Sequence, residues 1–357
     1  MSAVARKKKT KGGDVMTYPF RNLVFEGGGV KGIAYVGALA ILEEKGILPQ
    51  ITRVGGTSAG AINAVLLGVG YTREEMLEIL LDLDFRSFLD DDWGIVRDTA
   101  RVLREYGWYK GDFFHDWIGS LIEKKVGNAH ATFNDIHGRG REMYFIGTNL
   151  STRFSEVFSF EHTPRMRIAD AVRISMSIPL FFSAVTSARG DCYVDGGVLD
   201  NYPIKLFDRA KYVATEELAR HSLRPAYYEA ENARFLKDHP DRSPYVYNRE
   251  TLGFRLDSAQ EIAVFRDGAE PPVQKIEDFF DYGWALIDTI LDSQASQHLH
   301  SDDWQRTVYV DTLGVSTTDF DLDSETKLQL VESGLTHTKR YFDWYDDPTS
   351  TPANRPG

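Results

Sequence analysis

Two glycine-rich turns near the start of the chain most constrain its fold, because each lies between a strand-like run and a helical run. The run 22–26 leads into the turn 27–32 and then into an apolar helical segment. The β-branched run 51–54 leads into the turn 56–60 and a helix rich in Ala, Leu and Val. Strand, turn and helix repeated in this order are typical of a parallel sheet covered by helices. We therefore predict an α/β fold in which helices cover both faces of a central, mostly parallel sheet.

The second turn places Ser58 between two glycines, Gly56 and Gly60, where a strand is expected to give way to a helix. A sharp turn of this kind exposes a serine hydroxyl as a nucleophile, and the glycines let neighbouring segments approach closely. The same pentapeptide can also be a plain glycine turn in which the serine caps a buried helix. The choice between these two interpretations depends on the rest of the chain.

The first turn matches the spacing of a dinucleotide-binding loop, with Gly27, Gly29 and Gly32 between a strand and a helix. Such a loop requires an acidic residue about 20 residues further on, at the end of the second strand. This chain has Val-Gly-Gly there, at 54–56. A phosphate-binding P-loop is excluded as well, because Ile33 follows Gly32 where lysine and Ser/Thr are required.

The first turn suits an oxyanion hole better than a nucleotide site. Consecutive glycines at a helix start leave backbone N–H groups without partners and let a ligand approach, where the helix dipole favours negative charge. The tetrahedral intermediate of ester attack needs donors of this kind. Within Gly27 to Gly32 the main candidates are Gly28 and Gly29, and Lys31 can add positive potential.

A serine nucleophile needs a base, and the chain offers two kinds of candidate. Asp195 lies at the end of a strand-like run and precedes Gly196 and Gly197, which let its backbone approach other segments. Asp-Gly is also a common hairpin turn, so the aspartate alone decides nothing. Histidines follow the serine turn too, but without a recognisable context; among them are His221, His239, His298, His300 and His337.

Taken in order, the glycine turn 27–32, the serine turn 56–60 and the Asp-Gly-Gly segment 195–197 resemble the patatin-like phospholipase family. That family is similar to the catalytic domain of cytosolic phospholipase A2. The resemblance extends from about Phe20 to Ile204 and includes the block Arg173 to Phe182.

The resemblance implies that Ser58 is the nucleophile and that Asp195 is its partner in a dyad without histidine. It also implies that Gly27 to Gly32 stabilise the oxyanion, that an acyl-serine forms, and that neither a metal nor another cofactor takes part. Because an unperturbed aspartate has a pKa of about 3.9, it is a weak base toward a hydroxyl. We expect partial burial to raise the pKa of Asp195.

The chain is expected to contain a single patatin-like α/β hydrolase domain between two tails. We assign 1–18 to a disordered basic tail, 19–345 to the domain and 346–357 to a disordered tail. The aromatic-rich segment 85–117 is either a helical excursion packed over the sheet or a lid over the serine. A charged insertion is expected over 206–249.

Composition limits the partners of the chain. The net charge of −12 offers no broad basic surface, which excludes nucleic acid as a partner. No apolar run approaches the length of about 18 residues needed to cross a bilayer, and the single cysteine, Cys192, fits a reducing compartment. Together with the family resemblance, which implies a lipid acyl hydrolase of phospholipase A type, these limits predict a cytoplasmic enzyme that meets membrane glycerophospholipids at the bilayer surface.

Three alternatives stay open. The same serine turn serves acyl thioesterases and acyltransferases, and a lipid-binding protein can retain a catalytic appearance without activity. Some bacterial proteins of the family resemble effectors that a cyclic nucleotide switches on in antiphage defence. A cyclic-nucleotide activator is therefore a further hypothesis, although no sequence motif identifies a site for it.

Overall fold

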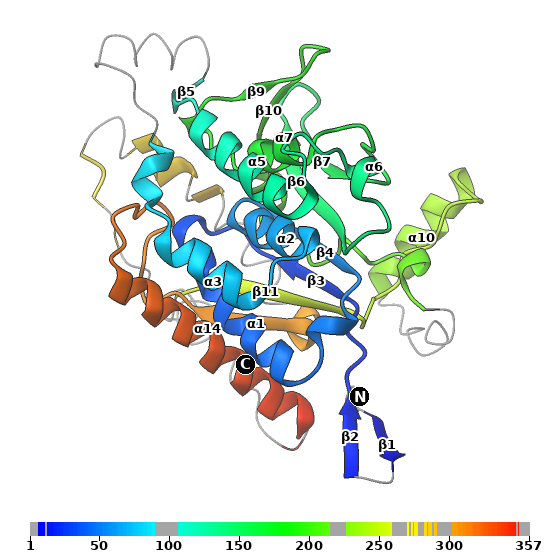
Figure 1. Cartoon of the computed structure of the whole chain (residues 1–357). Coiled ribbons are helices and arrows are strands. Elements are labelled where there is room, and N and C mark those ends of the chain that lie inside the picture. The colour runs from blue at the N-terminus through cyan, green and yellow to red at the C-terminus, as the bar shows by residue number, and fades with distance from the viewer. Residues whose placement is uncertain are drawn as a thin grey trace.

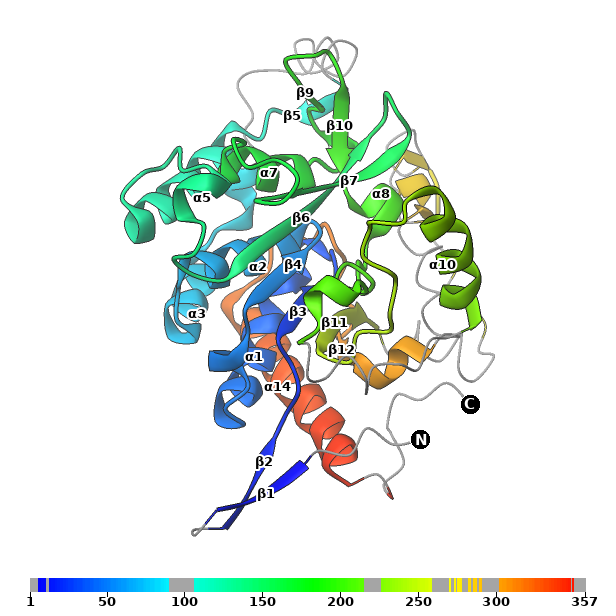
Figure 2. The same cartoon turned by 90° about the vertical axis from the view of Figure 1, so that its right-hand side faces the viewer.

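The fold is described from a computed structural model of the chain, shown in Figure 1. A central sheet is surrounded by helices, and the N-terminal strands extend away from the main body in Figure 2. The structure describes residues 6–10, 13–89, 106–214, 226–258, 302–347 and 349, together with 270, 273, 275–277, 282–283, 285–287 and 289–290.

A mixed sheet of eight strands lies at the centre of the described structure. Its strands are β3 (Asn22–Phe25), β4 (Arg53–Gly56), β6 (Glu142–Asn149), β7 (Phe154–Ser159), β9 (Val185–Thr186), β10 (Cys192–Asp195), β11 (Thr251–Asp257) and β12 (Thr307–Asp311). They are ordered β12-β11-β3-β4-β6-β10-β9, and β7 also pairs with β6. From β12 to β6 neighbouring strands are parallel, whereas β7, β9 and β10 pair antiparallel.

The pairing of β6 brings the ends of two other strands together. β4 pairs with residues 142–145 of β6, and β10 pairs with residues 147–149. β7 occupies the opposite edge of β6 along 144–149, so β4 and β10 must share the remaining edge. Because β10 runs antiparallel to β6, the carboxyl ends of β4 and β10 face each other along this edge.

Helices cover the sheet between its strands. α2 packs on β3, β4 and β6, α7 packs on β6 and β10, and α1 packs against α14. Among the described helices are α1 (Ala34–Glu44), α2 (Ala59–Val69), α3 (Arg73–Asp82), α5 (Asp112–Val126), α6 (Phe133–Ile136), α7 (Ile168–Ser175), α8 (Gly197–Asp200), α10 (Ala226–Asp238) and α14 (Ser324–Asp346). Single helical turns are η1 (Gly29–Ile33), η2 (Leu48–Gln50), η3 (Phe85–Phe88), η4 (Ala210–Tyr212) and η5 (Asp302–Arg306).

The two faces of the sheet have separate cores. Successive side chains of a strand point to opposite faces, so Leu23 and Phe25 of β3 join the large core beneath the helices. Val24 points the other way and packs with Tyr144 in a smaller core. The segment 202–212, which includes η4, covers that second face.

The predicted α/β fold class is confirmed, because parallel strands at the centre of the sheet alternate with helices. The helix predicted after the serine turn is α2, and the strand predicted over 22–26 is β3. The strand expected to end in Asp-Gly-Gly is β10, which ends at Asp195.

The peripheral segments differ more from expectation. The described parts of the tail expected to be disordered form an antiparallel pair, β1 (Arg6–Thr10) and β2 (Gly13–Thr17), whose backbone groups bond to each other (Figure 2). A parallel pair of β5 (Gly107–Tyr109) and β8 (Leu180–Phe182) lies in and beside the aromatic-rich segment.

Other expectations fall partly outside the described residues. In the aromatic-rich segment, residues 90–105 lie outside the described structure, so the lid over 85–117 stays a prediction. In the charged insertion, residues 215–225 lie outside the described structure, and the described part of the insertion includes α10. Of the tail expected over 346–357, only 346, 347 and 349 are described. No helix among the described residues has the length and apolar character needed to span a membrane.

Candidate active site

Ser58 occupies a strained turn between β4 and α2. Its backbone has φ 54° and ψ −124°, a conformation that non-glycine residues rarely adopt and that usually marks a functional turn. The side chain is only 5% exposed, and the residue stands at the N-terminus of α2, where the helix dipole is positive. These are the features of a nucleophile elbow.

The glycines of the serine turn allow close backbone contacts. A Cβ atom on Gly60 would lie 2.3 Å from the carbonyl oxygen of Phe25, and one on Gly56 would lie 2.4 Å from the carbonyl carbon of Gly60. Since real Cβ contacts are longer, both positions require glycine. The turn can therefore be as sharp as it is only because α2 starts directly against β3.

The sheet brings Asp195 next to the serine turn. Gly56 lies opposite Phe145 of β6, and Asp195 lies opposite Gly147, two residues further along the same edge. The end of α7 and the residues just after it then hold both groups, since Ser58 N–H donates to Ser175 Oγ at 3.0 Å and Asp195 N–H donates to the Ser177 carbonyl at 2.8 Å. The serine and the aspartate are thus positioned by one strand edge and one helix end.

Asp195 is a buried carboxylic acid with one oxygen available. Its Oδ1 accepts the N–H of Gly197 at 2.7 Å, while Oδ2 accepts no hydrogen bond from any group in the described structure. The Ser58 hydroxyl points to Met176 Sδ at 3.5 Å in this conformation. Burial raises the pKa of Asp195 to about 7, although the Gly197 N–H and the nearby Ser58 hydroxyl lower it. Rotation of the hydroxyl toward Oδ2 would satisfy the buried oxygen.

The first glycine turn supplies unpaired backbone donors. Within the described residues, neither the N–H of Gly28 nor that of Gly29 donates a hydrogen bond, whereas the Gly27 N–H donates to the Asn201 carbonyl at 3.0 Å. Gly27 is therefore not available as a donor, in contrast to the other two amides. The N–H of Ala59, just after the serine, also makes no hydrogen bond to a described group. An amide in this position commonly completes an oxyanion hole, and its place after Ser58 was the signal that could have found it.

Other members of the turn shape it. Gly29 has φ 55°, and a Cβ there would lie 2.0 Å from the Thr317 carbonyl oxygen, so no other residue fits. Gly32 brings η1 close to α2, because a Cβ on it would lie 2.9 Å from the Cβ of Ala59. The Lys31 side chain folds back over Gly28, 3.5 Å from the site of a Cβ there. Lys31 therefore lies close to the unpaired amides.

The segment after Asp195 connects the three motifs. Gly196 packs against the backbone of β6, where a Cβ would lie 2.4 Å from the Ile146 carbonyl oxygen. Thr57 Oγ1 then donates to the Asp200 carbonyl at 2.9 Å, and Asn201 Nδ2 donates to the Gly27 carbonyl at 3.3 Å. α8 and the residue after it, Asn201, therefore bind both glycine turns. Asn201 was inside the sequence block used for the resemblance, but its role depends on this contact.

A buried ionic group lies below the first glycine turn. Glu26, directly before Gly27, accepts the Leu256 N–H at 2.7 Å and lies 3.7 Å from the Arg255 guanidinium. Arg255 also pairs with Asp257 at 2.6 Å. Burial raises the pKa of Glu26, and Arg255 opposes that shift. Sequence reasoning missed this group because β11, which supplies two of its members, lies far along the chain.

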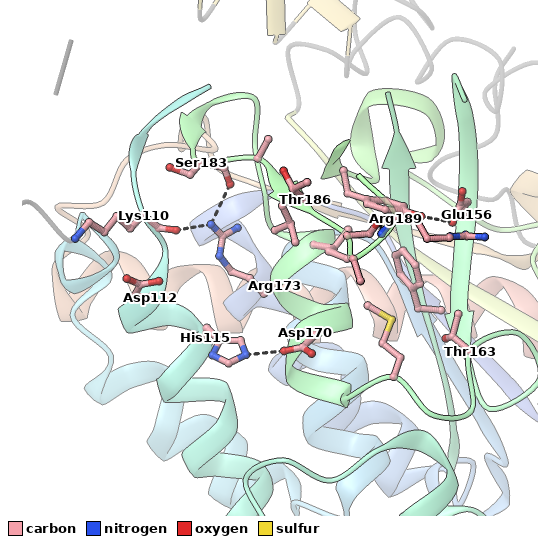
Figure 3. Close-up of a pocket in the computed structure, with 18 residues that line it drawn as sticks. Lys110, Asp112, His115, Glu156, Thr163, Asp170, Arg173, Ser183, Thr186 and Arg189 are labelled. Atoms are coloured by element: carbon pink, nitrogen blue, oxygen red, sulfur yellow. Dashed lines mark hydrogen bonds and ion pairs between the residues drawn. The ribbon is translucent and has the colours of Figure 1, made fainter. Parts of the chain in front are cut away.

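A cavity of about 870 Å³ lies beside α7 (Figure 3). Its lining includes His115 and Asp170, 2.9 Å apart, and Arg173, which donates to the Ser183 carbonyl at 3.1 Å. Neither Ser58 nor Asp195 lines it. The cavity is therefore not the space in which the serine would meet an ester.

A comparison with protein families decides the relationship of the chain. A sequence model of the family described as "Patatin-like phospholipase" matches residues 23–208, which is more than half of the chain. The chain belongs to the patatin-like phospholipase family. Membership makes this patatin-like protein a lipid ester hydrolase. The match contains both glycine turns and Asp195, whereas β11, β12 and α14 lie outside it.

Individual relatives agree with this relationship. The chain is 29% identical over 330 residues to "Uncharacterized protein YqhO" of Bacillus subtilis, covering 89% of this chain and 97% of that one. It is 28% identical over 188 residues to "Probable lipid hydrolase 463L" of Invertebrate iridescent virus 6, covering 52% of this chain and 63% of that one. Among solved structures, VipD from Legionella pneumophila has a TM-score of 0.56 at 18% identity, covering 97% of this chain and 71% of VipD. That likeness shows the fold alone.

Proposed function

We propose that this patatin-like protein hydrolyses fatty acyl esters of membrane glycerophospholipids with Ser58 as nucleophile and Asp195 as base. The observation that supports the proposal is the register of β4 and β10 on one edge of β6, where the strained turn of Ser58 and the buried carboxyl group of Asp195, with its unpaired Oδ2, follow the facing strand ends. The unpaired amides of Gly28 and Gly29 support an oxyanion site in the adjacent turn. The name of the viral relative, a probable lipid hydrolase, agrees with this substrate class.

The first half of the reaction transfers the acyl group to the enzyme. Asp195 takes the hydroxyl proton while Ser58 Oγ bonds to the ester carbonyl carbon, and the carbonyl oxygen becomes an oxyanion. N–H donors stabilise that charge, and removal of one such donor commonly raises the barrier by about 2.7–4 kcal/mol. When the intermediate collapses, the ester C–O bond breaks and the departing alcohol oxygen takes the proton from Asp195. A lysophospholipid leaves, and an acyl-serine remains.

The second half releases the fatty acid. Asp195 takes a proton from water, whose oxygen bonds to the acyl carbon and forms a second oxyanion. When this intermediate collapses, the bond from the acyl carbon to Ser58 Oγ breaks, and the serine recovers a proton from Asp195. A base with a pKa of about 7 suits both steps, because a catalytic group works best when its pKa lies near the operating pH.

Two substitutions test the dyad. Ser58→Ala is expected to remain folded and to lose fatty-acid release from phospholipid vesicles, and Asp195→Asn is expected to be inactive as well. Ser120→Ala and Asp238→Asn, the latter at an exposed aspartate of α10, are matched controls outside the proposed dyad and should keep activity. Release that persists in folded Ser58→Ala would refute the proposal, and activity retained in Asp195→Asn would point to another base.

Two further measurements define the reaction class. Labelling of Ser58 by a fluorophosphonate probe is expected, and its absence would favour a lipid-binding protein with a vestigial site. Turnover of an acyl thioester that exceeds turnover of phospholipid would favour a thioesterase or acyltransferase. Activation by a cyclic nucleotide, and with it a role in antiphage defence, stays a prediction. Vesicle hydrolysis measured with and without candidate cyclic nucleotides tests it, and no stimulation by any of them would reject it.

A further inference from the structure

Exposed apolar side chains gather around one hairpin beside the proposed catalytic strands. Phe154 at the start of β7 is 70% exposed, and Leu150 just after β6 is 47% exposed. Leu199 in α8, which contacts β6 and β7, is 45% exposed. Large apolar side chains at neighbouring positions of the surface mark an interaction site more often than isolated ones do.

The hairpin of β6 and β7 extends past the serine turn, beyond the carboxyl end of β4. β6 continues four residues beyond Phe145, the residue opposite Gly56, which corresponds to about 13 Å at the usual rise of a strand. β6 is the direct neighbour of β4, and β4 leads into Ser58. A flat surface that approached the carboxyl ends of the parallel strands would therefore meet the tip of this hairpin near Ser58.

A second hairpin supports the first one. Cys192 N–H, at the start of β10, donates to Ser151 Oγ at 3.0 Å, and Leu150 N–H donates to the Cys192 carbonyl at 2.8 Å. The two hairpins thus lie side by side, toward the top of Figure 2. Each turn exposes one arginine, Arg153 in the first and Arg189 in the second, and Arg189 also lies 3.7 Å from the Asp191 carboxylate. The tip therefore combines apolar side chains with cations at their margin.

We propose that these residues form a membrane-docking tip, in which Leu150, Phe154 and Leu199 enter the headgroup region of a phospholipid bilayer while Arg153 and Arg189 contact lipid phosphates. This inference rests on the proposed function and names the surface that brings the bilayer to its site. Aromatic side chains are favoured at membrane–water interfaces, and arginine keeps its charge in the headgroup layer while its stem contacts apolar groups.

The small size of the tip favours a bilayer over a protein partner. A stable protein interface commonly uses about 20–30 residues on each side, whereas the tip offers three apolar side chains and two cations. Weak binding is sufficient for an enzyme whose substrate is itself the surface. It also allows the enzyme to leave the membrane between encounters.

The test compares binding to phosphatidylcholine vesicles with turnover of a soluble short-chain ester. Phe154→Ser combined with Leu150→Ser is expected to lower vesicle partitioning and vesicle hydrolysis about tenfold or more, and to leave turnover of the soluble ester within about twofold of wild type. Leu328→Ser is the matched control, because Leu328 on α14 is 51% exposed and lies outside the tip. It should leave vesicle binding unchanged.

The outcomes separate the two proposals. Normal vesicle binding and hydrolysis by the double variant would overturn the docking tip and leave the proposed function intact. Wild-type protein inactive on both substrates would instead refute the proposed function. A variant inactive on both substrates although folded would also count against the tip, because the residues would then act on the catalytic groups.

A gain of signal gives a second test that folding defects cannot imitate. Phe154→Trp is expected to be quenched by brominated phosphatidylcholine vesicles to a greater extent than wild type, whereas Leu328→Trp should add no such quenching. No additional quenching in Phe154→Trp would overturn the proposal. Capture of the tip by a second copy of the chain, seen as concentration-dependent dimers that the double variant abolishes, would also overturn it.

Discussion

The two glycine turns of the site are held in different ways. The shape of the serine turn comes from nearby segments, since Gly60 packs on β3 and the Ala61 N–H donates to the Ser58 carbonyl at 2.8 Å. The distant residues Ser175 and Asp200 add one hydrogen bond each. The first glycine turn depends on distant segments, since the Val30 N–H donates to the Thr317 carbonyl at 3.2 Å and the Gly27 N–H donates to the Asn201 carbonyl at 3.0 Å. The difference shows why the shape of the serine turn can be predicted from five residues, whereas the amides that stay unpaired in the first glycine turn depend on its long-range contacts.

The largest effect on stability and activity is expected from Gly60→Ala, which disturbs the serine turn. The new Cβ would lie 2.3 Å from the Phe25 carbonyl oxygen, so β3 and α2 must separate. We expect a loss of about 3 kcal/mol or more in the free energy of unfolding, measured by urea denaturation, together with the loss of activity.

Gly119→Ala is the control for that substitution. Gly119 is a buried helical glycine whose added Cβ would meet only ordinary contacts at 3.7 Å. This variant is expected to be neutral or more stable by up to about 1 kcal/mol. Equal stability of the two variants would show that the close contact at Gly60 is not what holds the serine turn.

Gly29→Ala disturbs the first glycine turn at its contact with the distant Thr317. The substitution adds a Cβ 2.0 Å from the Thr317 carbonyl oxygen at φ 55°. We expect kcat for a soluble ester to fall about 100-fold, the usual cost of a lost oxyanion donor, with a smaller loss of stability than in Gly60→Ala.

Gly46→Ala separates the two causes of that effect. Gly46 has φ 66°, yet nothing lies within 4 Å of its added Cβ. It therefore reports the cost of the left-handed backbone alone, about 1 kcal/mol of stability. If Gly29→Ala and Gly46→Ala had the same small effect on kcat, the contact with Thr317 would not position the donors.

Activity should depend on pH through Asp195. Burial raises the pKa of this carboxyl group to about 7, and only its ionised form can take the serine proton. Below about pH 7 we expect kcat/KM for a soluble ester to fall about tenfold per pH unit, and above it to level off. A flat profile from pH 5 to pH 8 would mean that another group is the base.

The same raised pKa of Asp195 predicts that stability falls with rising pH, whereas activity rises. The unfolded aspartate ionises near 3.8, whereas the folded one binds its proton up to about 7. Between these values the unfolded state binds fewer protons, so the contribution of Asp195 to stability falls as pH rises through this window. Asp195→Asn should therefore gain melting temperature relative to wild type between pH 4 and pH 8, and a constant difference would contradict this.

The smallest effect is expected from Lys31→Met. Lys31 folds over Gly28 in the first glycine turn, but it is partly exposed, and solvent screens its charge. We expect a decrease in kcat of about threefold, more at low salt than at high salt. Lys339→Met, an exposed lysine on α14, is the control and should not change kcat. A decrease in kcat of Lys31→Met that does not depend on salt would indicate that the Lys31 side chain acts through packing.

Much of the core could be predicted because its signals are local. The strand at 22–26 and the helix after the serine turn show their apolar pattern within a few residues, and the structure places β3 and α2 there. The hairpin of β1 and β2 was missed, since charged residues conceal its pairing. Gly27 was grouped with the oxyanion donors, but its N–H is taken by Asn201, a contact between residues far apart in the chain.

The sequence by itself determined the family, the fold class and the two turns, because glycine spacing and apolar periodicity act over short stretches of backbone. The tertiary structure decided how these pieces meet. β6 is long enough to accept both β4 and β10 on one edge, and this register brings Asp195 to Ser58. The pairing of β6 with β7 also placed the exposed Phe154 beyond the serine turn. Strand register is a property of paired segments, so it becomes definite only when distant parts of the chain pack against each other.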